Sequence, residues 1–490
     1  MSRLCHLSVI ACILCGCSFD PPPGVTPPAP GKQWQAAHAG ASSSVPVVAS
    51  TAPSMVGEHV DLPSSVSLGE LLDYALKTNP LTSSSWYHAR AAYADVGVAR
   101  ASYFPRIDVG LEGERSRRYS NVGVNGNTVY NKRGGSYAAL DYMLFDFGGR
   151  EARIDQAQQA LIAANYGHNA AVEQVVLQLQ RSYCQYVALR FLVKSFVVGV
   201  KDAEVNLDAA QNRRSAGVAT IADVLQARTA LSRAQYSLQS AQGQMAAVRG
   251  AVLTAAGLKP SAPIDIAEVS FSELPTEGVN DEVETLIAQA EANNPELASG
   301  KARVATANEH VRVVRSQGYP VIGLGARVDR WNYVGGTSSD DYTATLGLTF
   351  PLFTGFSYSY ELEKAKAEAA RAASDYRLLE DERMLAVWTD YYAYKTAAQQ
   401  IKTTADMFAS AQQSYDVALG RYKEGVGSIL DLLSAQSALE ESRATQVKSY
   451  ADWYLSLAQL RFDIGTLAAE PLALVATAQP TQMNLLQEKK

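Results

Sequence analysis

The sequence predicts an internally duplicated α+β membrane protein, in which each half carries a pair of strands on a very long helical hairpin. Motifs in the 490-residue chain return at a constant spacing, and each repeat holds two segments of alternating polar and apolar residues. A long helical stretch without proline follows each pair. Because a barrel in lipid must pair all its backbone groups and single-chain barrels need at least about eight strands, four strands predict an oligomer. Three chains would give twelve strands.

The first sixteen residues are typical of an export signal, with a charged start and an apolar stretch that is too short to span a membrane as a helix. The stretch ends in Leu14-Cys15-Gly16-Cys17, which resembles a bacterial lipoprotein box. We therefore predict a lipoprotein signal over 1–16 and a covalent lipid, such as palmitate, on Cys17. An ordinary secretory signal that is cleaved elsewhere is the alternative. In the lipoprotein class, Ser18 rather than aspartate implies export to the outer membrane.

Residues 17–65 are rich in Pro, Ser, Ala and Gly, and we predict that they form a tether from the acylated cysteine. Of the five cysteines, Cys184 alone would remain without lipid after the signal is removed. The sequence therefore predicts neither a disulfide framework nor a thiolate metal site.

Two structural repeats, 66–275 and 276–468, make up the rest of the chain before a tail at 469–490. Asn79-Pro80 returns as Asn294-Pro295 after 215 residues. Leu144-Phe145 returns as Leu352-Phe353 and Gly217-Val218 as Gly425-Val426, both after 208 residues. The first half therefore has a loop seven residues longer between its strands, and the period is far longer than that of a solenoid repeat.

The elements follow in the same order in both halves. Each half has an opening helical stretch (68–102, 283–317), a strand pair (about 106–146, about 319–352) and a long helical hairpin (about 150–257, about 356–464). The first helix of each hairpin, at about 65 residues, would be roughly 100 Å long. It ends at Gly217 or Gly425, where a left-handed turn favours glycine.

The alternating segments predict strands with one polar face, and the Gly-, Asn- and Ser-rich stretches 116–135 and 332–340 predict exposed loops between them. We expect the polar face to line a pore and its acidic excess to favour cations. Trp331 and Tyr333, at a strand end, are expected in an aromatic girdle. A soluble sheet with one wet face is the alternative. The predicted lumen residues are Asp108, Glu112, Glu114, Asp141, Arg327 and Asp329.

The duplicated plan and its motifs resemble the TolC family of outer-membrane channel proteins, in the lipoprotein branch that serves efflux systems. The likeness covers roughly residues 65–468. The motifs that carry it are Asn79-Pro80, Ala91-Ala92, Phe104-Pro105, Leu144-Phe145-Asp146 with Gly148-Gly149-Arg150, Arg421-Tyr422-Lys423-Glu424-Gly425-Val426-Gly427-Ser428, and Asp431-Leu432-Leu433.

The resemblance implies a homotrimer with a twelve-stranded outer-membrane barrel that continues as a helical coiled-coil tunnel in the periplasm. A periplasmic adaptor (membrane fusion) protein and an inner-membrane pump would be its partners. The resemblance also implies a periplasmic constriction formed by acidic residues at two positions, which are Asp431 and Ser434 in this chain. It further implies a gate link between Tyr422 and Asp223. For Asp223 by itself, a capping role in the first helical turn is favoured. The predicted tip and adaptor contacts are Gly217, Val218, Ala219, Thr220, Gly425, Val426, Gly427 and Ser428.

Several function classes are set aside on sequence grounds. A net charge of −6 does not suggest a nucleic-acid partner. The chain lacks the H-E-x-x-H, G-x-S-x-G and Walker A motifs, so we expect no enzyme activity, no metal and no cofactor besides the lipid. The leading hypothesis is a passive exit duct for toxic small molecules or antibiotics. A channel for type I protein secretion and a pore-free periplasmic coiled-coil protein remain the alternatives.

Overall fold

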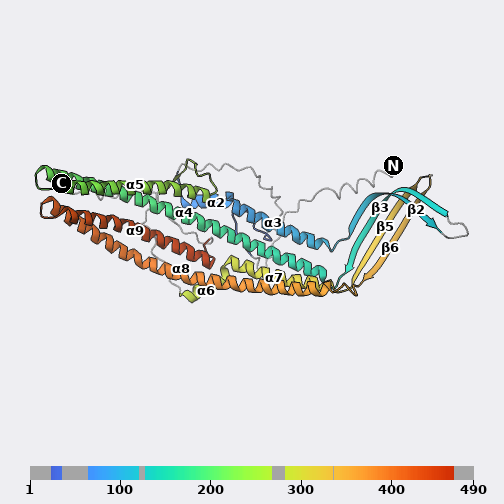
Figure 1. Ribbon diagram of the computed structural model, residues 1–490. Coiled ribbons are helices and arrows are strands. Elements are labelled where there is room, and N and C mark those ends of the chain that lie inside the picture. The colour runs from blue at the N-terminus through green and yellow to red at the C-terminus, as the bar shows by residue number, and fades with distance from the viewer. Residues whose placement is uncertain (1–23, 36–64, 121–126, 268–281, 335, 468–490) are drawn as a thin grey trace.

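A computed structural model of the chain describes residues 24–35, 65–120, 127–267, 282–334 and 336–467. The described part is elongated. A four-stranded sheet lies at one end, and long helices run from it to two helical turns at the other end (Figure 1). This arrangement confirms the predicted α+β fold with long helical hairpins.

The two halves contain matching elements. The first half consists of β1 (Ser65–Val66), α2 (Leu68–Thr78), α3 (Pro80–Ala101), β2 (Arg106–Ser120), β3 (Asn127–Phe145), α4 (Gly149–Ser215) and α5 (Ile221–Ala255). The second half consists of α6 (Val283–Asn293), α7 (Pro295–Ser316), β5 (Val321–Tyr333), β6 (Ser338–Thr349), α8 (Ser357–Lys423) and α9 (Ile429–Ile464). The short strand β4 (Asp265–Ile266) follows α5 and pairs in parallel with β1.

The duplication extends to individual hydrogen bonds. Asn79 caps α3, which begins with proline, and its Nδ2 donates to the carbonyl of Ala255 at the end of α5 (3.1 Å). Asn294 caps α7 in the same way and donates to the carbonyl of Asp463 at the end of α9 (3.0 Å). The two acceptors are 208 residues apart, so the register read from the sequence is also a structural register.

The four long strands form one antiparallel sheet in the order β2-β3-β5-β6, which leaves β2 and β6 at its edges. β2 continues to Ser120 and β3 begins at Asn127, so most of the predicted loop 116–135 is strand instead. The loop prediction was wrong because polar and glycine residues here lie on a strand pair whose backbone groups satisfy each other across the register.

The helices form a curved layer around α4, which packs against α3, α5, α7 and α9. Within the described residues, α4 is the one helix long and apolar enough to cross a membrane by length and composition. Leu179 and Tyr183 of this helix are fully buried in the core with residues of α2, α5 and α9, although only 28% of its apolar stretch is buried within the chain.

Residues 24–35, within the predicted tether, are bound to α3 and α4. Trp86 Nε1 donates to the carbonyl of Pro27 (2.9 Å), and Asn165 Nδ2 donates to that of Val25 (2.9 Å). The fully buried His168 contacts the carbonyl of Lys32 through Nε2 (3.0 Å), and burial lowers the pKa of this histidine. This part of the tether is thus a docked segment. Cys17, the signal and the tail at 469–490 lie outside the described residues.

Candidate functional site

The register of the sheet brings all six predicted lumen residues to one face. Asp141 pairs with Arg106 on one side and with Gly325 on the other, so residues of even number on β2 share a face with residues of odd number on β3 and β5. The opposite face is apolar and exposed, as at Val109 (78%) and Leu111 (87%). Such an exposed apolar face is suited to contact with lipid.

Arginines accompany the acidic residues on the polar face. Arg327 contacts both Glu112 (3.0 Å) and Asp329 (2.9 Å), and Arg133 Nε donates to Glu114 (2.7 Å). Arg106 similarly pairs with Asp108 (2.9 Å). The expected acidic excess is therefore largely compensated. Sequence reasoning missed the contribution of Arg133 because this residue was assigned to a loop.

Trp331 also lies on the polar face, which corrects the expectation that it belongs to a lipid-facing girdle. Its ring is 6% exposed, and the guanidinium carbon of Arg133 lies 3.8 Å from the ring centroid. Tyr333 pairs with Arg133 in the sheet and shares this face. A position at a strand end predicts depth in the membrane, but only the strand register decides the face.

The predicted tip residues form the two turns at the far end of the helices (Figure 1). Gly217 (φ 78°) and Gly425 (φ 83°) adopt the left-handed conformation that ends each long helix. Thr220 caps α5 and Ser428 caps α9. The exposed apolar side chains at the turns are Val218 (63%) and Val426 (69%).

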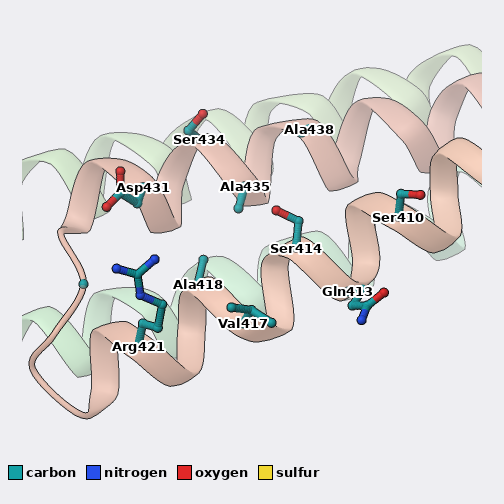
Figure 2. Close-up of a pocket in the computed structure, with 11 residues that line it drawn as sticks. Ser410, Gln413, Ser414, Val417, Ala418, Arg421, Asp431, Ser434, Ala435 and Ala438 are labelled. Atoms are coloured by element: carbon teal, nitrogen blue, oxygen red, sulfur yellow. The ribbon is translucent and has the colours of Figure 1, made fainter.

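Asp431 and Ser434 lie one turn apart on the exposed face of α9, beside a groove between α8 and α9 (Figure 2). The backbone N–H of Asp431 donates to Ser428 Oγ (3.1 Å), so Asp431 is also a first-turn acid that the helix dipole stabilises. Arg421 on α8 points toward Asp431 across the groove (Figure 2). This positive charge was not included in the sequence-based description of the constriction.

Tyr422 does not make the predicted hydrogen bond to Asp223 within this chain. The Asp223 carboxylate instead accepts from the backbone N–H of Thr220 (2.8 Å), as the capping role predicts. Among the described residues, the buried Tyr422 hydroxyl has no hydrogen-bond partner. Burial raises the pKa of Tyr422, while the nearby charge of Arg213 lowers it and that of Asp223 raises it.

Arg213 forms the link that Asp223 was expected to form. Its guanidinium carbon lies 4.6 Å from the Tyr422 ring centroid, and its Nη1 donates to the Tyr422 carbonyl. Since Arg213 belongs to α4 and Tyr422 to α8, this contact joins the two helical hairpins just above the tip. An arginine near a helix C-terminus is an ordinary dipole partner, so the sequence carried no distinct signal for this role.

The family model described as outer membrane efflux protein matches residues 71–258 and 286–466. The chain belongs to this family. The two matched segments coincide with the two structural halves. As an outer membrane efflux protein, the chain is an outer-membrane channel component of a Gram-negative efflux system, and this agrees with the sheet whose exposed face is apolar.

Curated relatives of this outer membrane efflux protein extend over most of its length. Protein CyaE of Bordetella pertussis is 28% identical over 84% of both chains. The pyoverdine export outer membrane protein OpmQ of Pseudomonas aeruginosa is 26% identical over 95% of this chain and 96% of its own. The toluene efflux pump outer membrane protein TtgC of Pseudomonas putida is 24% identical over 93% and 95%, respectively.

Solved structures share the fold. The outer-membrane channel OprN has a TM-score of 0.73 at 18% identity and matches 81% of this chain and 89% of its own. VceC from Vibrio cholerae has a TM-score of 0.72 at 18% identity, over 81% of this chain and 96% of its own.

Proposed function

We propose that this outer membrane efflux protein is the passive exit duct of a tripartite pump for toxic small molecules and that it works as a homotrimer. The observation that carries the proposal is the position of the free edges. β2 and β6 are the sheet edges, and α3 and α8 are the corresponding edges of the helices nearest the sheet. An edge strand in lipid must find a partner, so β6 of one copy pairs with β2 of the next until the ring closes. Three copies give a barrel of twelve strands.

The helical tips supply the contact with the rest of the pump in this proposal. Val218 and Val426 are exposed at the two turns and suit a helical adaptor protein that joins the duct to an inner-membrane transporter. The transporter supplies the energy, and the duct catalyses no reaction. The names of two relatives, which refer to pyoverdine export and toluene efflux, support a small-molecule cargo.

The function is tested by comparing a deletion strain with its complemented parent on a panel of amphipathic antibiotics, dyes and organic acids. Selective hypersensitivity that complementation reverses is the expected result. An unchanged profile, together with loss of a protein from the culture supernatant, would instead favour the exit channel of a protein secretion system.

The lipid anchor gives a direct prediction. Cys17→Ala is expected to abolish incorporation of labelled palmitate and to weaken assembly or function, while still permitting barrel insertion. Cys184→Ala is the matched control, because Cys184 is buried within α4 and burial raises the pKa of its thiol to about 12. Label retained in Cys17→Ala would contradict the assignment of the acylation site.

The constriction gives a second prediction. Asp431→Ala is expected to raise single-channel conductance and to reduce block by multivalent cations several-fold, because three carboxylates around a threefold axis attract such ions. The control is Asp223→Ala at the equivalent position of the first half, which removes a capping carboxylate and should leave the block unchanged. If block is unchanged in Asp431→Ala, the constriction lies elsewhere.

A further inference from the structure

Two large aromatic side chains on the polar face of the sheet each lie directly opposite a glycine. Tyr137 on β3 pairs with Gly110 on β2, and Trp331 on β5 pairs with Gly135 on β3. Both aromatics therefore have a neighbouring strand position without a side chain. The strand register sets both pairs: the first joins β2 to β3, and the second joins β3 to β5, two residues away along β3.

The aromatic rings occupy the space that a Cβ atom would need. A Cβ built on Gly110 would lie 2.7 Å from both Cε1 and Cζ of Tyr137. A Cβ built on Gly135 would lie 2.8 Å from Cε3 of Trp331 and would also meet the Arg330 carbonyl oxygen. Real Cβ contacts essentially never fall below 3.0 Å, so each ring lies flat against the backbone only because glycine is there.

Guanidinium groups cover the other side of the rings. Arg327 lies with its guanidinium carbon 4.2 Å from the Tyr137 ring centroid, and Arg133 lies 3.8 Å from that of Trp331. Asp329 and Glu112 hold Arg327 in place, and Glu114 holds Arg133. Each ring is thus packed between the glycine backbone and a paired cation, an arrangement that favours the flat orientation.

We infer that Gly110 and Gly135 set the bore of the strand-built pore, because they allow Tyr137 and Trp331 to lie along its wall. This inference rests on the proposed trimeric duct, in which the polar face is the lumen. An alanine at either glycine displaces the ring from the wall and breaks its stacking on arginine. The ring then projects into the lumen and narrows the passage.

The test is a polymer-exclusion measurement on the full-length chain in planar bilayers. Neutral polyethylene glycols of graded size are added on the side of the bilayer where the barrel opens, opposite the helical tip. The tip then does not determine which polymers enter the barrel. The size cut-off for entry is expected to shift to smaller polymers in Gly110→Ala and in Gly135→Ala. A cut-off equal to that of the wild type in both variants would overturn the inference.

Two further variants separate ring displacement from other effects. Gly325→Ala adds a methyl group on the same face, where the nearest atom to the new Cβ is Asp141 Oδ1 at 4.0 Å, and should leave the cut-off unchanged. The double variant Gly110→Ala with Tyr137→Ala should recover the wild-type cut-off, because the three atoms nearest to the new Cβ all belong to the Tyr137 side chain. A double variant as narrow as Gly110→Ala alone would contradict the proposed cause.

Variants of the aromatics test the same inference without any added Cβ. Tyr137→Ala and Trp331→Ala are expected to change the cut-off little, since the rings belong to the wall, and a large increase would show that they already stand in the lumen. The proposed duct can fail separately from the role of the glycines. A wild-type trimer that never conducts would overturn the duct itself. A conducting wild type whose size cut-off is the same in the glycine variants would overturn only the role of the glycines.

Discussion

Arg213→Ala is expected to open the helical tip and to increase the open-channel population at least about tenfold. Arg213 stacks on Tyr422 and donates to its carbonyl, and these contacts connect the two hairpins. Contacts of this kind contribute about 1–2 kcal/mol each, and about 1.4 kcal/mol corresponds to a factor of ten in an equilibrium constant. Three copies of the link in a trimer would add to the effect.

Single-channel recording of the full-length protein measures this effect as open probability. Arg214→Ala is the matched control, because Arg214 is the next residue on α4 and is exposed. Arg213→Lys keeps the charge without the planar group and should give an intermediate open probability. If Arg213→Ala and Arg214→Ala behaved alike, the contact with Tyr422 would not hold the tip closed.

The second large effect is expected at Asp463, where Asp463→Asn should stabilise the protein far more at pH 9 than at pH 5. The fully buried Asp463 carboxylate accepts from Gln459 (2.8 Å), lies 3.4 Å from Arg383 and is hydrogen-bonded to Asp390. Arg383 is also shared with Glu296 (3.2 Å). Burial, followed by the contact with Asp390, raises the pKa of Asp463 to about 7.

The direction of the pH dependence follows from this raised pKa. The folded protein binds the Asp463 proton more tightly than the unfolded chain, whose aspartate has an ordinary pKa of 3.8. The stability that this proton contributes is complete below about pH 4 and is lost as the pH rises through about 7. Asparagine keeps the shape and stays neutral, so its gain in the free energy of unfolding at pH 9 is expected to exceed that at pH 5 by on the order of 3 kcal/mol.

The duplication provides an internal argument for this prediction. The positions 208 residues before Arg383, Asp390 and Asp463 are Val175, Ser182 and Ala255, which are all uncharged. The first half therefore forms the equivalent junction, with its Asn79 hydrogen bond, without charges at these three positions. Burying charged groups costs desolvation free energy. Replacing one member of the cluster by a neutral group of the same shape is therefore expected to stabilise the protein.

Thermal unfolding of the detergent-solubilised chain at pH 5 and pH 9 measures the difference between the variant and the wild type. Glu173, whose pKa burial raises to about 8, is present in both proteins and titrates in both measurements. Asp452→Asn, on the same helix but outside the cluster, serves as the control. A gain at pH 5 as large as that at pH 9 would contradict a protonation effect.

The sequence alone determined the duplication, the order of the elements and the polar face of the sheet. These features have local signals: Asn-Pro at a helix start, glycine at a helix end, and period-two alternation within a strand. For the same reason, the capping role of Asp223 was predictable from its place in the first helical turn. The described helices and strands follow these expectations closely, except where a polar strand pair was taken for a loop.

Only the tertiary structure decided which of these residues meet. Arg213 and Tyr422 are 209 residues apart, and Asp223 was a reasonable partner for Tyr422 until its carboxylate was found in a cap. The sequence assigned Gly135 to a loop and Trp331 to an aromatic girdle, and no local pattern says which glycine lies opposite which ring, because that depends on the strand register. Packing of separate helices and strands decides which residues become partners. No local pattern in the chain encodes the distance between two residues on different elements.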